Sequence, residues 1–221
     1  MVATLCFTIV LLLSSIVANA APAATATTPP KGACTISSVK VDDPDVDTEG
    51  SGCRAGTVSA QFSTDNSLVT LIFDDFAAAI GPDAGTTKKR ALCKVNVTMS
   101  SPGWAFDVNT VDFRGYIELG KGVNASLVTR WKWVDSKGVD IPGKGNAQKK
   151  LTGPLTQDFL VHKDGETSDS ETSMCVKASA TFQITISATL AASTSAMSGV
   201  VQGGAVDSGF SEIMNLGWKK C

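Results

Sequence analysis

The sequence predicts an all-β protein, an antiparallel β-sandwich of about eight or nine strands that is stapled by disulfides. Apolar and polar residues alternate with a period of two over residues 176–190, which gives one face of a long strand to a core and the other to solvent. Shorter alternating segments recur along the chain between turn residues. No window of ten or more residues carries an amphipathic helical stripe, apart from a candidate helical turn at residues 76–80. Strands at this spacing in one domain are typical of a sandwich.

The N-terminal segment has the pattern of a secretory signal. Residues 5–17 are almost wholly apolar and lead into Ala18-Asn19-Ala20, a small-x-small sequence that a signal peptidase accepts. We therefore expect residues 1–20 to be a signal peptide and the mature protein to be secreted and extracellular. The apolar run is too short to span a bilayer and no second run follows, so no stable membrane insertion is expected. We expect residues 21–33 to form a flexible Ala/Thr/Pro-rich leader and residues 34–221 a single β-sandwich domain.

The predicted strands follow one another through short turns. Residues 57–63 and 68–73 form a predicted hairpin, and Ser101-Pro102-Gly103 reverses the chain before another strand. The remaining predicted strands are residues 93–99, 104–108, 111–119, 127–134, 159–161, 176–190 and 210–218. We expect surface loops at residues 135–158 and 163–173, and a connection of small residues at 191–204.

Five cysteines remain once Cys6 is lost with the signal peptide. They are widely spaced and form no C-x-x-C pair, which in an exported chain indicates disulfides rather than a metal site. We predict that two bridges form among four of them, in any of three pairings, and that Cys34 is unpaired. The four predicted bridge residues are Cys53, Cys93, Cys175 and Cys221.

Composition excludes several function classes. The formal net charge is -2 and only 18% of residues are charged, so a nucleic-acid partner is not expected. The single histidine, His162, cannot assemble a zinc site by itself, and the chain has neither a His-Glu-x-x-His motif nor an Asp-rich calcium loop. We expect no metal and no cofactor.

Carboxylates offer the strongest candidates for catalysis. Asp75, Glu118 and His162 are the residues that a hydrolase would use, but Asp74 and Asp75 are adjacent and would point to opposite faces. No Gly-x-Ser-x-Gly elbow supports a Ser/His/Asp triad. We therefore predict no catalytic residue. A structural ion pair between Asp75 and Arg114 is expected instead, because a guanidinium inside an apolar strand needs a bidentate acid.

Trp131 and Trp133 are spaced to lie on one face of a strand. An exposed pair would form an apolar platform for sugar rings, whereas an inward pair would belong to the core. Arg130 and Lys132 occupy the opposite, more solvent-like face, which favours the core.

Two further features concern modification. The sequons at Asn96 and Asn124 predict N-glycosylation if the host glycosylates. Lys88-Lys89-Arg90 is a basic triplet in a loop that a processing protease could reach, although a solvated loop is the favoured interpretation.

Several short motifs occur in a fixed order. They are Gly50-Ser51-Gly52-Cys53, Phe73-Asp74-Asp75-Phe76, Lys89-Arg90 before Cys93, Phe113-Arg114-Gly115-Tyr116, Leu151-Thr152-Gly153-Pro154, Asp158-Phe159-Leu160-Val161-His162, and Trp218 before Cys221. Together they resemble the domain-of-unknown-function 4360 family, small secreted proteins mostly of fungi, over residues 34–221. The resemblance implies a secreted, cysteine-bridged β-sandwich without an established activity. The chain departs from the family pattern at Met174-Cys175-Val176 and in its extra Cys34.

These features lead to an expected function. We expect a secreted non-enzymatic protein that acts by surface contact outside the cell, as an effector or elicitor-like protein of a fungus that meets a host extracellular protein. The host interface is implied by the family resemblance. The first alternative is a carbohydrate-binding module for cell-wall polysaccharide that uses Trp131 and Trp133, and the second is a secreted hydrolase.

Overall fold

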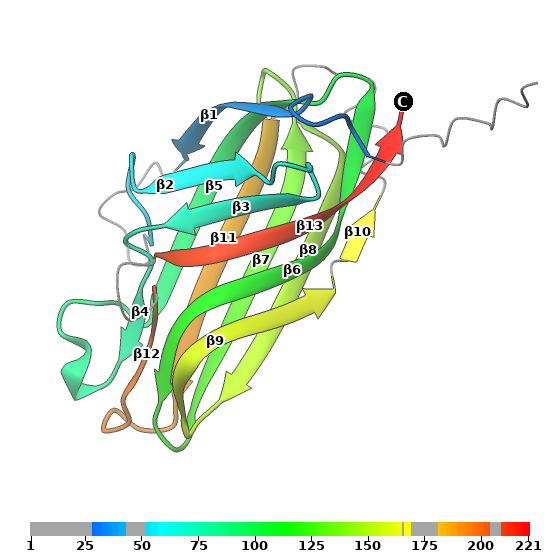
Figure 1. The fold of residues 1–221 in the computed structure, drawn as a ribbon. Helices are drawn as coiled ribbons and strands as arrows, with labels where there is room; N and C mark the ends of the chain where they lie inside the picture. Colours follow the sequence, from blue (N-terminus) through cyan, green and yellow to red (C-terminus); the bar gives the residue numbers. More distant parts are fainter. Residues whose placement is uncertain (1–27, 43–51, 165, 169–180, 204–208) are drawn as a thin grey trace, which may run out of the picture.

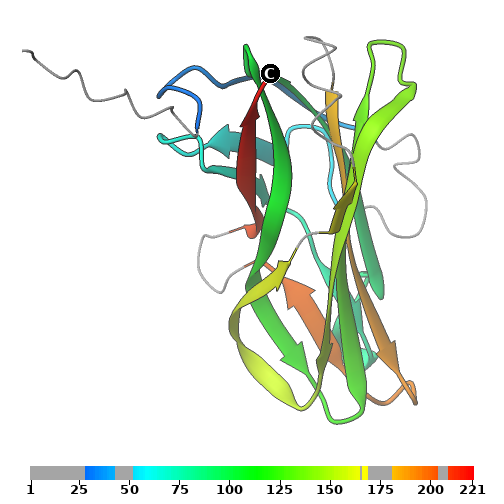
Figure 2. The same cartoon turned by 90° about the vertical axis from the view of Figure 1, so that its right-hand side faces the viewer.

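The computed structural model describes residues 28–42, 52–164, 166–168, 181–203 and 209–221, which form two antiparallel sheets packed face to face (Figure 1). Figure 2 shows the sheets edge-on as separate layers. The six-stranded sheet has the order β1 (Thr35–Val41), β5 (Arg90–Ser100), β11 (Thr181–Ala192), β7 (Val123–Val134), β8 (Asp140–Thr152) and β10 (Glu166–Ser168). The predicted sandwich is therefore confirmed.

The second sheet has seven strands. Its order is β2 (Val58–Phe62), β3 (Leu68–Phe73), β13 (Phe210–Lys220), β6 (Trp104–Leu119), β12 (Gly199–Gln202) and β4 (Ala78–Ile80), with β9 (Leu155–Asp164) paired to the other edge of β6. A short 3-10 turn, η1 (Pro82–Ala84), follows β4. No helix in the described ranges is long and apolar enough to cross a membrane.

The described residues contain more strands than the eight or nine predicted, for three local reasons. The segment predicted as a loop at 135–158 contains β8, whose backbone pairs with β7 although few of its side chains are apolar. A bulge that leaves Asn109 without a partner on β13 joins two predicted strands into β6. The predicted helical turn at 76–80 contains β4, which pairs with β12 in the predicted 191–204 connection.

The core lies between the sheets and is rich in aromatic rings. Phe106 packs at 5.3 Å from Trp133, 5.4 Å from Phe182 and 5.1 Å from Trp218 between ring centroids. Phe73, Phe76 and Phe210 form a second group near the start of β13. Rings at these distances bury large apolar areas, and they hold the two sheets together.

The cysteines follow the prediction in part. Cys53, ahead of β2, forms a disulfide with Cys93 on β5. Cys221 is also disulfide-bonded, and Cys34 is a buried free thiol. Burial raises the pKa of Cys34 to about 11, which keeps it protonated and unreactive at neutral pH. Cys175 lies outside the described residues.

The expected flexible leader ends earlier than residue 33. Pro29 is buried, and Asn66 Nδ2 donates hydrogen bonds to the carbonyl oxygens of Pro30 at 2.9 Å and Pro29 at 3.3 Å. Asn66 itself has a positive φ of 59°, and its carbonyl oxygen accepts a 2.6 Å bond from Trp218 Nε1. Residues 28–33 are therefore attached to the β2–β3 turn, because polar groups there satisfy the proline carbonyls.

Candidate functional site

The outer face of the six-stranded sheet is strongly cationic, and we call it the basic face. Alternation along each strand puts valines, isoleucines and tryptophans inward and polar residues outward. Its charged side chains described by the structure are the cations Lys40, Arg90, Lys94, Arg130, Lys132, Lys144 and Lys150 and the acids Asp42 and Asp140. Cations therefore outnumber acids among the described side chains of this face, although the whole chain has a formal net charge of -2.

Strand register arranges these cations in rows across the sheet. One row places Lys132 directly opposite Lys144. A second row places Arg130 on β7 opposite Asn146 on β8. A third row runs from Arg90 on β5 through β11 and β7 to Lys150 on β8. Like charges directly opposite one another destabilise a sheet, and the carboxylate of Asp140 beside Lys132 offsets this repulsion.

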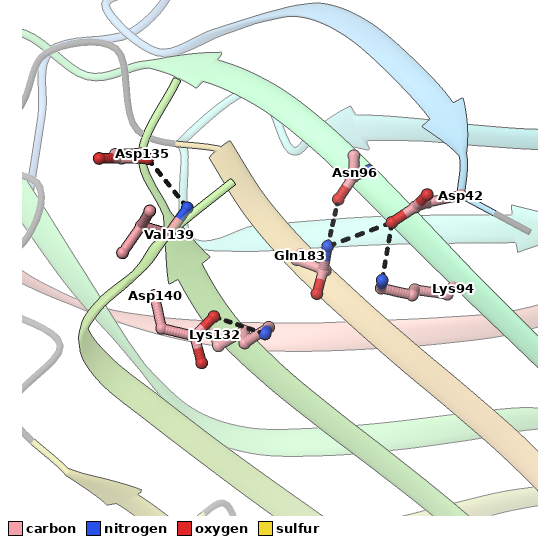
Figure 3. Close-up of polar contacts among 8 residues, drawn as sticks. All are labelled: Asp42, Lys94, Asn96, Lys132, Asp135, Val139, Asp140 and Gln183. Carbon is pink, nitrogen blue, oxygen red and sulfur yellow. Dashed lines mark hydrogen bonds and ion pairs between the residues drawn. The ribbon is translucent and has the colours of Figure 1, made fainter. Parts of the chain in front are cut away.

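Part of the positive charge is neutralised within the face (Figure 3). Lys94 Nζ lies 2.7 Å from Asp42 Oδ2, and Gln183 Nε2 donates to Asn96 Oδ1 at 2.8 Å. The hydrogen bond from Lys94 lowers the pKa of Asp42, which keeps that carboxylate ionised. This cluster ties β1 to β5 and β11, and its role is structural.

A second neutralised pair lies at the β7–β8 end of the face. Lys132 Nζ is 2.6 Å from Asp140 Oδ1, and both appear together in Figure 3. Asp135 Oδ1 accepts the Val139 backbone N–H at 2.9 Å and closes the turn between the strands. Val139, at the tip of this turn, is 59% exposed and is the exposed large hydrophobic residue of the described chain.

The remaining cations are available for a ligand. Lys40, Arg90, Arg130 and Lys150 are exposed, and none makes an ion pair with a described residue. Most outward positions between them are hydroxyl and amide side chains, and the half-buried Leu92 and Val128 are the aliphatic ones. These side chains donate and accept hydrogen bonds with hydroxyl groups, and the free cations attract carboxylates or sulfates.

The predicted catalytic candidates are not brought together. Asp75 accepts two hydrogen bonds from Arg54, Glu118 accepts one from Tyr116 Oη at 3.1 Å, and His162 Nδ1 lies 2.6 Å from Asp112 Oδ1. His162 pairs with β6 at Asp112, six residues from Glu118, or roughly 20 Å along the strand. The three residues therefore do not form a shared active site.

The predicted ion pair between Asp75 and Arg114 is wrong. Asp75 pairs with Arg54, with Nη2 at 2.6 Å from Oδ2. The prediction placed the guanidinium inside the protein, but Phe113 is the neighbour that points into the core, and Arg114 is exposed on the outer side of β6. A cation in water needs no buried acid.

The predicted tryptophan platform does not exist at the surface. Trp131 and Trp133 are 2% and 0% exposed and belong to the core, the alternative that their polar neighbours favoured. They cannot stack on a polysaccharide in this fold. The sequon residues Asn96 and Asn124 both lie on the basic face, Asn96 near its centre and Asn124 at the end of β7.

Comparison with known proteins places the chain in a family. Residues 38–221 match the family described as domain of unknown function (DUF4360). The chain belongs to this DUF4360 family. An uncharacterized secreted protein of Arthroderma benhamiae is 30% identical over 178 residues, which cover 78% of this chain and 68% of that protein. The resemblance predicted from the ordered motifs is therefore confirmed.

A solved structure of another protein also matches this DUF4360 chain. It is TmCBM61 in complex with beta-1,4-galactotriose, with 11% identity and a TM-score of 0.20, over 83% of this chain and 88% of that one. A TM-score of this size supports no argument about the site.

The basic face of this DUF4360 protein was not predicted from the sequence. Arg130 and Lys132 stood out as solvent-facing, but Lys144 and Lys150 fell in a predicted loop. The only available signal was the period-two spacing of Asn146, Gln148, Lys150 and Thr152, which is that of the outward side of a strand.

Proposed function

We propose that this protein is an extracellular binding protein that holds an anionic polysaccharide on its basic face and acts without catalysis. The observation that carries the proposal is the set of four exposed cations, Lys40, Arg90, Arg130 and Lys150, which have no carboxylate partner among the described residues. The relative described as a secreted protein supports an extracellular location.

The spacing of the cations suits an extended polymer. Arg130 and Lys150 lie on neighbouring strands and four residues apart in register, which is about 13 Å along the strands. Arg90 and Lys150 share a transverse row three strand spacings wide, or about 14 Å. A compact anion cannot reach all three, whereas one chain with repeated carboxylates can.

The side chains that lie between the cations also suit a sugar polymer. Thr185, Ser187 and Thr189 line the outward side of β11, between the cations of β5 and those of β7 and β8. Hydroxyl groups of this kind exchange hydrogen bonds with sugar hydroxyls. Guanidinium groups such as Arg130 bind carboxylates in a bidentate manner.

Affinity electrophoresis through gels containing polygalacturonate, dextran sulfate or neutral dextran tests the proposal. We expect the protein to be retarded by the anionic polymers only, and less so as salt increases. Arg130→Gln combined with Lys150→Gln is expected to remove most of the retardation. Arg114→Gln is the matched control, because it removes an exposed strand cation from the opposite sheet.

Three outcomes would contradict the proposal. Equal retardation by neutral dextran would show that charge does not direct binding. Unchanged mobility in every gel, from protein with a normal circular dichroism spectrum, would shift the search to a host extracellular protein as partner. Release of reducing sugar from any polymer would contradict the non-catalytic part.

A further inference from the structure

A pocket of about 300 Å³ lies on the other sheet, where β4, η1 and β12 meet β6. Its lining includes Ile80, Asp83, Thr87, Glu118, Val200 and Gln202. We infer that this pocket binds a cationic sugar, a 2-amino-2-deoxy unit whose ammonium group lies between Asp83 and Glu118. The basic face is on the opposite side of the sandwich and has the opposite charge, so this inference is independent of the proposed function.

The segment just before β12 holds the pocket walls in place. Ser198 Oγ donates to Asp83 Oδ2 at 3.4 Å, and the Ser198 carbonyl oxygen accepts from the Gly120 N–H at 2.9 Å. Gly81, ahead of η1, has a φ of 106°, and a Cβ there would lie 2.6 Å from the Met197 carbonyl oxygen. Glycine therefore permits the close approach of η1 to the segment just before β12.

The charged groups of the pocket are all acidic. Asp83 and Glu118 contribute carboxylates, and no lysine or arginine is among the lining residues. Tyr116 Oη holds Glu118 from one side, and the Glu118 carboxylate raises the pKa of Tyr116. Asp158, opposite Tyr116 on β9, adds further negative charge. An ammonium group is the ligand group that such a field favours.

The other lining groups suit a sugar ring. Ala79 and Val200 provide apolar contact, while the Gln202 amide and Thr87 hydroxyl can donate and accept hydrogen bonds. The volume is at the lower end of the range for small-molecule sites, which matches one or two sugar rings. A neutral sugar would satisfy the amide and hydroxyl groups but would leave both carboxylates without a cation.

Isothermal titration of the mature protein with three tetrasaccharides tests this inference. The probes are the glucosamine tetramer, its fully N-acetylated counterpart and cellotetraose, at a pH where the sugar amine is protonated. We expect saturable binding of the glucosamine tetramer and at least tenfold weaker binding of the other two. Glu118→Gln and Asp83→Asn keep the side-chain shapes, and each is expected to weaken the binding about tenfold.

Two control variants make the outcome decisive. Asp112→Asn removes a carboxylate from the same strand and sheet face, roughly 20 Å from Glu118, and should leave binding unchanged. Arg130→Gln with Lys150→Gln alters only the basic face and should also have no effect. Backbone amide shifts in NMR spectra should concentrate on η1, β12 and the end of β6.

Three results would overturn the inference: no saturable binding of the glucosamine tetramer, equal binding of all three probes, or the same loss in Asp112→Asn as in Glu118→Gln. The last result would show that diffuse negative charge, not the pocket, attracts the amine. Failure here leaves the binding of anionic polymers to the basic face unaffected, since that uses other residues and other probes.

Discussion

Glu212 on β13 and Thr129 on β7 are neighbours in the interior between the two sheets, and both side chains are 0% exposed. Neither makes a hydrogen bond with ordinary geometry. In strand register Glu212 lies between Leu71 and Phe113, which are apolar. A buried carboxyl without a partner is expected to be neutral, because ionisation in such surroundings is costly.

The first prediction is that Glu212 makes stability fall with rising pH. Burial raises its pKa from 4.5 to about 8, while Thr129 lowers it slightly. Below pH 4.5 the carboxyl is protonated in both the folded and the unfolded protein. Between pH 4.5 and 8 it is ionised in the unfolded protein and still protonated in the folded protein. The free energy of unfolding should therefore fall by about 1.4 kcal/mol per pH unit in that window and level off above it.

Urea denaturation at pH 5, 6, 7 and 8 measures this effect. Glu212→Gln cannot ionise, so its stability relative to the wild type should rise steadily across the series. Parallel pH profiles for the two proteins would show that Glu212 does not titrate in this window.

The second prediction concerns the aromatic core. Trp133→Ala should lower the free energy of unfolding by about 3–5 kcal/mol, because Trp133 packs against Phe106 and Phe182 and is fully buried. Guanidinium denaturation followed by circular dichroism measures the loss. Trp133→Phe, which keeps a ring and removes an unsatisfied indole N–H, should cost much less. Near-normal stability of Trp133→Ala would contradict a core position.

The third prediction is that the Cys53–Cys93 bridge stabilises the fold. It closes a loop of 40 residues that joins the segment before β2 to β5. Restricting a loop of this length in the unfolded state stabilises a protein by about 3–4 kcal/mol. Cys53→Ala combined with Cys93→Ala should lower the midpoint of thermal unfolding accordingly. Cys34→Ala serves as a cysteine control outside the bridges, and an equal loss there would argue against the bridge as the cause.

The fourth prediction separates the two sequons. Asn124 is exposed, and its Oδ1 accepts from Thr152, which leaves the amide nitrogen open to a glycan. Asn96 is half-buried, accepts from Gln183 and hydrogen-bonds Asp42. We expect glycan at Asn124 and little at Asn96 when a glycosylating host secretes the protein.

Peptide mass spectrometry of the secreted protein decides between the sequons. Asn124→Gln should remove the glycan mass, whereas Asn96→Gln should not. Full occupancy of Asn96 would show that glycan addition precedes formation of the polar cluster around Gln183.

Local patterning was sufficient to predict which side of most strands faces the core. Phe182, Ile184 and Ile186 alternate with polar residues on β11, and they are buried as predicted. The same rule applied to β7 favoured Trp131 and Trp133 as core residues, and both are buried. These outcomes are local, because the pleat of a strand alone sends neighbouring side chains to opposite faces.

Pairing between strands that are distant in the sequence decided which side chains come together in the candidate sites. Arg114 faces solvent and does not meet Asp75. The strands beside β6 at this point are β13 and β9, whereas the segment after β3, which carries Asp75, lies elsewhere. Arg130 and Lys150 share a face only because β8 pairs with β7 in one register. Glu118 and Asp83 line one pocket only because β12 brings η1 next to β6. Alternation specifies the two faces of each strand, but only packing and strand pairing specify which charges become neighbours.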